Sequence, residues 1–290
     1  MDFLKKNVDK IVALLTVMVL ALFALRIALF LTFSPAGEGT FRYWMYDVLG
    51  IEAAAGEERP ALPPNQVAWP FDGPLGQYDM ASVRRGLQVY RESCSACHGL
   101  NQIAFRNLTE IGYSEGAAKE IAAEYTVTDG PDAYGDMFER AGRLTDYFPS
   151  PFANQNAAMA ANSGAAPPDL SLITKARGDG PNYVYSILTG YGDAPDGFEF
   201  NSDVTNYNPY FPTWEILMMA PLFEDMVEYQ DGTEANVEQM AADVTNFLMW
   251  TAEPNLDDRH KMGFKVTAYM VVLTILLFFS MRVIWRRVKK

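Results

Sequence analysis

The sequence is poor in the residues that build disulfide frameworks and metal clusters, since its 290 residues include only two cysteines and two histidines. Two cysteines three positions apart cannot form the disulfide framework of a small secreted domain. A zinc site needs four ligands, and His260 is the one histidine besides the Cys94, Cys97 and His98 group. We therefore expect neither a disulfide-stabilised scaffold nor a zinc site.

Basic residues are scarce in the middle of the chain. Residues 34–259 contain 12 Lys and Arg against 34 Asp and Glu, whereas residues 260–290 contain seven basic residues and no acidic ones. Such an acidic field repels nucleic acid and speeds association with a basic partner, although acidic surfaces also serve solubility alone. Nucleic-acid binding is disfavoured.

Two long apolar runs flank this acidic part. Ile11–Phe33 contains one interior charge, Arg26, and is long enough to cross a hydrocarbon core of about 30 Å as a helix. Basic residues before an apolar run occur in cleaved signals and in anchors alike. The length of the run and the lack of a nearby small-residue cleavage site favour a retained anchor over a removed signal.

The second apolar run, Gly263–Ile284, is followed by a basic tail and predicts a transmembrane helix. Basic residues stay in the cytoplasm, so the acidic domain is expected on the opposite, periplasmic side. We expect four parts: an N-terminal transmembrane anchor or signal-like segment at 1–34, a linker at 35–68, a periplasmic domain at 69–259, and a transmembrane helix with a basic cytoplasmic tail at 260–290.

The apolar periodicity of the central part predicts a mainly α fold. Helices are expected from about Met80 to Ser93, near Asn182–Leu188 and near Val237–Ala252, where apolar residues recur at helical spacing. Residues 125–170 are rich in Gly, Pro, Asn and Asp without sustained periodicity, so we expect an irregular loop there.

Cys94-Ser95-Ala96-Cys97-His98 has the C-x-x-C-H spacing of c-type haem attachment. Two thiols at this spacing reach the two vinyl groups of one haem, while the adjacent imidazole reaches its iron. A thioredoxin-like redox pair would want a βαβ setting and has no need of the histidine. The motif predicts one covalently bound haem c.

The sixth iron position of an electron carrier is often closed by methionine, whose soft thioether raises the potential. Most of the 14 methionines are expected to be core filler. Met218 and Met219 stand out because they follow NPYFP, a Pro-bordered segment that can deliver a side chain to the haem face.

From Trp69 to the C-terminus the chain resembles the cytochrome c1 family, the haem subunits of the cytochrome bc1 complex, in its alphaproteobacterial and mitochondrial form. The resemblance rests on FDGPLGQYD, RGLQVYRESCSACHGL, TDYFPSPFANQNAAMAANSGAAPPDLS, NYVYSILTGY, NPYFP, LFEDMVEYQDGT and DVTNFLMWTAEP, in the family's order. It implies a cytochrome c-type haem domain with irregular loops, held at the membrane by its C-terminal helix.

The resemblance also implies roles for single residues. Cys94 and Cys97 become the thioether sites and His98 the proximal ligand. The family's axial methionine lies ten residues before the glutamate of the V-E-[YF]-x-D-G phrase, here Glu228, which selects Met218. Matching the family's Met-Ala-Pro selects Met219 instead, at the cost of a gap. The residues expected around the haem are Asn162, Pro168, Arg177 and Tyr183. Arg177 suits a haem propionate, because a guanidinium pairs well with a carboxylate, and Arg106 is a second candidate for this role.

The resemblance implies an electron relay with no substrate chemistry in this chain itself. The haem would take an electron from the Rieske iron-sulfur protein and give it to cytochrome c, in a dimeric complex with cytochrome b. That complex lies in the bacterial inner membrane or the inner mitochondrial membrane. Two alternatives stay open: a haem enzyme with an open sixth site, and a membrane-anchored c-type cytochrome of another respiratory complex.

Overall fold

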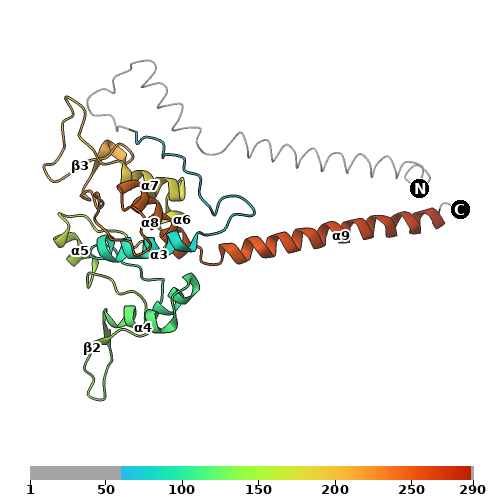
Figure 1. Ribbon diagram of the computed structural model, residues 1–290, viewed down its shortest axis with the longest axis horizontal. Helices are drawn as coiled ribbons and strands as arrows, with labels where there is room; N and C mark the ends of the chain where they lie inside the picture. The colour runs from blue at the N-terminus through green and yellow to red at the C-terminus, as the bar shows by residue number, and fades with distance from the viewer. Residues whose placement is uncertain (1–59, 289–290) are drawn as a thin grey trace. The chain divides into compact units, whose positions relative to one another are not determined.

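The computed structural model describes residues 60–288, which are mainly helical (Figure 1). The predicted segment 1–34, with its apolar run, lies outside the described residues. The elements in chain order are α3 (Met80–Val89), the π-helical turn η1 (Tyr90–Cys94), the 3-10 helix η2 (Phe105–Ile111), α4 (Glu115–Ala123), β1 (Thr126–Asp129), β2 (Phe138–Ala141), α5 (Gln155–Ala161), α6 (Ile173–Ala176), α7 (Gly180–Thr189), β3 (Asn206–Tyr207), the 3-10 turn η3 (Pro212–Trp214), β4 (Glu215–Ile216), α8 (Val237–Ala252) and α9 (Leu256–Val288).

Helices α3 and α8 pack against each other and form the centre of the core (Figure 1). Leu87 of α3 and Met240 and Phe247 of α8 are completely buried, and each such side chain contributes about 1.5–3 kcal/mol by leaving water. The two backbones approach closely at Gly86, where an added Cβ would lie 2.0 Å from the carbonyl oxygen of Asp243. Glycine is therefore required at this crossing.

The ends of the central helices follow from local side-chain chemistry. Asp79 caps α3 by accepting a hydrogen bond from the N–H of Ala81 at 2.9 Å. Asn236 caps α8 by accepting from the N–H of Gln239 at 2.8 Å, and α8 ends just before Pro254, whose ring disfavours a helical residue before it. The helix predicted near Val237–Ala252 is confirmed.

The irregular loop predicted at 125–170 is wrong in two places. Strands β1 and β2 pair as an antiparallel hairpin, with Thr126 opposite Ala141, and α5 forms a short helix. Neither element buries an apolar stripe: the hairpin is exposed or half-buried throughout, and α5 buries only Ala158. Their stability comes from polar contacts such as the Asn154 cap of α5, which leave no periodic signal in the sequence.

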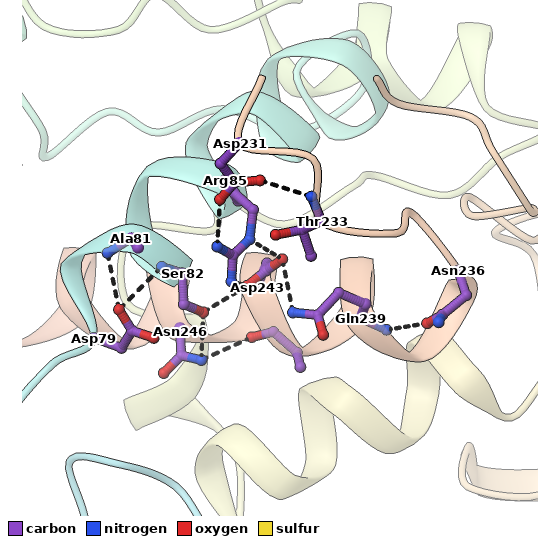
Figure 2. A network of polar contacts seen from close by, with 11 residues as sticks. Asp79, Ala81, Ser82, Arg85, Asp231, Thr233, Asn236, Gln239, Asp243 and Asn246 are labelled. Atoms are coloured by element: carbon purple, nitrogen blue, oxygen red, sulfur yellow. Dashed lines mark hydrogen bonds and ion pairs between the residues drawn. The ribbon is translucent and has the colours of Figure 1, made fainter. Parts of the chain in front are cut away.

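A buried carboxylate joins α3 to α8 (Figure 2). Asp243 is fully buried and accepts hydrogen bonds from Ser82 Oγ at 2.6 Å, from Gln239 Nε2 at 3.0 Å, and from Arg85 Nε and Nη2 at 2.8 and 2.9 Å. Arg85 also donates through Nη1 to Asp231, 2.8 Å away. A buried charge is stable only when paired and hydrogen-bonded in this way.

The long C-terminal helix contains the predicted span Gly263–Ile284. It runs from Leu256 to Val288 and is long and apolar enough to cross a membrane. Acidic residues stand in its first turn and basic residues in its last, which suits the helix dipole.

Polar contacts tie the start of α9 to the segment before α3. The N–H of Tyr78 donates to Asp257 at 3.0 Å, and His260 Nδ1 lies 2.7 Å from the carbonyl oxygen of Gly76. His260 therefore has a structural partner in the segment before α3.

Candidate functional site

The cysteine motif begins in the π-helical turn that continues α3. The N–H of Ser95 donates to the carbonyl of Tyr90, five residues back, at 2.8 Å, and such turns are frequent at functional sites. The N–H groups of Cys97 and His98 then both donate to the carbonyl of Cys94, at 3.1 and 2.9 Å. This tight turn gathers both thiols and the imidazole on one short segment.

Both thiols are unpaired, and they differ in exposure. Cys94 is half-buried and Cys97 is exposed. Burial raises the pKa of the Cys94 thiol to about 12. A thioredoxin-like pair needs a βαβ setting, whereas the strands within residues 60–288 pair only as antiparallel two-stranded sheets, which disfavours that alternative.

The imidazole of His98 is oriented by a backbone carbonyl. Its Nδ1 lies 2.7 Å from the carbonyl oxygen of Pro168, and because a carbonyl only accepts, Nδ1 carries the proton. Burial lowers the pKa of His98, so the ring is held neutral. The Nε2 lone pair is thus left available to a metal, the arrangement in which an outer partner fixes a ligating histidine.

A cavity of about 390 Å³ lies beside this segment, within the range of cofactor pockets. Its lining includes Cys97, Pro168 and Asp169, together with Asn154 and Ala158 of the α5 region. Asp169 is held in place by accepting from the N–H of Asn101 at 2.8 Å. Neither His98 nor Met218 is part of the lining of this cavity. The residues that suit a covalently attached haem are the two free thiols and the neutral imidazole with one open nitrogen.

Met218 lies in an irregular stretch directly after β4, as the Pro-bordered sequence predicts. Its carbonyl oxygen accepts from Tyr191 Oη at 3.1 Å and from Asn206 Nδ2 at 3.4 Å. Met218 is half-buried, whereas the Met219 side chain is 75% exposed. Met218 thus has the anchored backbone and partial burial that suit a ligand, and Met219 has neither.

The remaining predicted residues fall into different surroundings. The exposed Arg177 lies next to the half-buried Tyr183. Burial raises the pKa of the Tyr183 hydroxyl, and the positive charge of Arg177 partly opposes this increase. Asn162 ends α5 and donates to the carbonyl of Ala158, a cavity residue, at 2.7 Å. Arg106 is exposed on η2, and within residues 60–288 no hydrogen bond or ion pair links it to the others.

The sequence did not predict three residues that support the site. Tyr191 and Asn206 hold the carbonyl of Met218, and Tyr90 donates from its hydroxyl to the carbonyl of His98 at 3.0 Å. Tyr191 lies within the conspicuous phrase NYVYSILTGY, but its partner stands 27 residues away. No local pattern reveals such a contact.

Comparisons with known proteins agree with these features. A family model described as "Cytochrome C1 family" matches residues 69–288. The chain is 47% identical over 245 residues to a "Cytochrome c1, heme protein, mitochondrial" of Schizosaccharomyces pombe, covering 84% of this chain and 80% of that protein. It is 46% identical over 257 residues to "Cytochrome c1" of Rhodospirillum rubrum, covering 83% and 94%. A Candida albicans "Cytochrome b-c1 complex catalytic subunit, mitochondrial" is 45% identical over 251 residues, covering 86% and 87%.

Proposed function

Because the chain belongs to the cytochrome c1 family, we propose that it carries one covalently bound haem c and transfers electrons as the haem subunit of a cytochrome bc1 complex. The observation that carries this proposal is the C-x-x-C-H turn with its neutral His98, oriented by the carbonyl of Pro168 at 2.7 Å. The name of the Candida albicans relative places that protein in a b-c1 complex.

Cys94 and Cys97 would hold the haem covalently as thioethers, and His98 and Met218 would be the two side chains that bind its iron. The haem supplies one-electron chemistry, with no bond made or broken on a substrate in this chain. A thioether sulfur favours ferrous iron and raises the potential, so Met218 suits the subunit to accept electrons.

Arg177 and Tyr183 are proposed to bind a haem propionate, because a guanidinium pairs well with a carboxylate. Their proximity supports this assignment. Asn162 and Pro168 contribute to the haem surroundings, Pro168 through its hydrogen bond with His98. The proposal for Arg106 rests on the resemblance alone.

The proposed electron path runs from the Rieske iron-sulfur protein through this haem to cytochrome c. Helix α9 anchors the domain in the membrane beside cytochrome b, and the basic residues at its end favour a cytoplasmic tail with the domain on the periplasmic side. In a eukaryote the same topology faces the intermembrane space. A dimeric complex is part of the proposal.

The acidic domain gives this path a measurable salt dependence. Between residues 34 and 259 acidic residues outnumber basic ones by 34 to 12. We expect the rate of electron transfer to a basic cytochrome c to fall about tenfold or more from low salt to about 0.3 M, because salt screens the attraction. Stopped-flow oxidation of the reduced protein measures this rate.

Ferricyanide serves as the matched control, because it is an anion and the acidic surface repels it. Its rate is expected to rise with salt. A rate with basic cytochrome c that does not change with ionic strength would sink the electrostatic part of the proposal.

A further inference from the structure

The residue before the first cysteine is tied to the segment that follows Met218. Ser93 Oγ donates to the carbonyl oxygen of Pro221 at 2.7 Å. In the described chain, residues 219–222 have no other hydrogen bond. A single side chain thus connects the turn that bears Cys94 to a stretch without regular secondary structure.

Two further ties run from α3 to the same part of the chain. Arg85 Nη1 donates to Asp231 at 2.8 Å, and Gln88 Nε2 donates to the carbonyl oxygen of Glu228 at 3.1 Å. Figure 2 shows the Arg85 contact, with the guanidinium held at its other side by Asp243. The segment from Pro221 to Asp231 is therefore fastened along one face of α3 and its continuation.

Ser93 lies in the π-helical turn η1, which continues α3 and in which the N–H of Ser95 donates to the carbonyl of Tyr90, five residues back. Gln88 Nε2 also donates to Glu92 at 2.9 Å, so Glu92 lies beside Gln88 on the helix. The hydroxyl of the next residue, Ser93, reaches the carbonyl of Pro221.

We propose that Ser93 is a positioning residue for the sixth iron ligand: its hydrogen bond to Pro221 holds the backbone after Met218 so that the methionine stays on the iron. This inference rests on the proposed function. Tyr191 and Asn206 bind the carbonyl of Met218 itself. Ser93 binds the carbonyl of Pro221, three residues further along the chain. Together they leave the methionine little freedom to swing away.

The test compares Ser93→Ala with two rescue variants and one control, all as full-length protein with haem attached. Ser93→Thr keeps the hydroxyl, whereas Ser93→Val has the shape of Thr without it. The control is Ser95→Ala. Within residues 60–288 the Ser95 hydroxyl has one hydrogen bond, to the carbonyl of Arg91 in its own turn at 2.8 Å. The measurements are carbon monoxide affinity of the reduced protein and the midpoint potential.

We expect Ser93→Ala and Ser93→Val to bind carbon monoxide about three- to tenfold more tightly than the wild type, as loss of one hydrogen bond allows, and to have lower potentials. Ser93→Thr and Ser95→Ala should match the wild type. If Ser93→Ala loses its haem, the carbon monoxide affinities of Ser93→Thr and Ser93→Val still test the role of the hydroxyl.

Equal carbon monoxide affinities for Ser93→Val and Ser93→Thr would overturn the positioning role, and so would an effect of Ser95→Ala as large as that of Ser93→Ala. Failure of the proposed function gives a different result: there the wild type itself would bind carbon monoxide readily.

Discussion

Replacing Arg85 with methionine is expected to lower the free energy of unfolding by about 3–5 kcal/mol, because it leaves a buried carboxylate without its charge partner. Asp243 has no exposed surface and receives two hydrogen bonds from Arg85. The carboxylate of Asp243 also raises the pKa of Arg85, which therefore stays charged. The hydrogen bonds from Ser82 and Gln239 remain but do not neutralise the charge.

The matched control is Arg91→Met, which removes a cation of the same helical stretch. Arg91 pairs with Glu124 at the surface, where the glutamate side chain is 56% exposed. Exposed pairs contribute about 0–1 kcal/mol, so this variant should unfold close to the wild-type midpoint. Thermal unfolding of the full-length protein in detergent measures both variants. A loss in Arg85→Met no larger than in Arg91→Met would show that the buried pair has no special role.

The double variant Arg85→Met with Asp243→Leu extends this prediction. It removes both charges and should recover part of the loss, since replacing a whole buried pair by apolar groups is far less costly than breaking it. Failure to recover would mean that the remaining contacts of Asp243 outweigh its charge.

Replacing Met218 with leucine is expected to open the sixth iron position. The midpoint potential should fall by about 100 mV or more, within the range of roughly 0.8 V over which axial ligands set haem potentials. The ferric protein should lose the weak red absorption band of methionine ligation, and the ferrous protein should bind carbon monoxide. Redox titration and optical spectra of the purified variant measure these changes.

Met219→Leu is the control, because the two methionines are adjacent and the substitution is identical. Met219 is 75% exposed, so this variant should keep the wild-type potential and spectrum. If Met219→Leu shows the changes and Met218→Leu does not, the ligand is Met219. If neither does, the axial ligand is another residue, or the sixth site is open as in the enzyme alternative.

Much of the fold was accessible from the sequence where apolar residues recur at helical spacing. Helix α8 was predicted because Met240, Val244, Phe247 and Leu248 recur in this way, and in the fold all of its residues from Asp243 to Thr251 are buried. The hairpin β1–β2 and helix α5 were missed because they expose nearly all their side chains. Helix α9 begins at Leu256, before the predicted apolar span. The prediction missed this start because the first turns of the helix are polar and bind the segment before α3.

The candidate site could be predicted only in part from the sequence, because only some of its residues form a local motif. Cys94, Cys97 and His98 form a local motif, and the matching family model confirms the predicted family. Met218 came from a residue count within that resemblance, and its role stays a prediction. Its supporting contacts join residues far apart in the chain: Ser93 and Pro221 are 128 positions apart. Only the folded chain brings such pairs together.

The most direct test of the central claim follows the haem of this chain during turnover. Quinol is mixed with the purified membrane complex, and the absorbance of the c-type haem is recorded before and after ferricytochrome c is added. We expect quinol to reduce this haem through the Rieske protein and ferricytochrome c then to oxidise it. A haem that stays oxidised while the complex turns over quinol would contradict it.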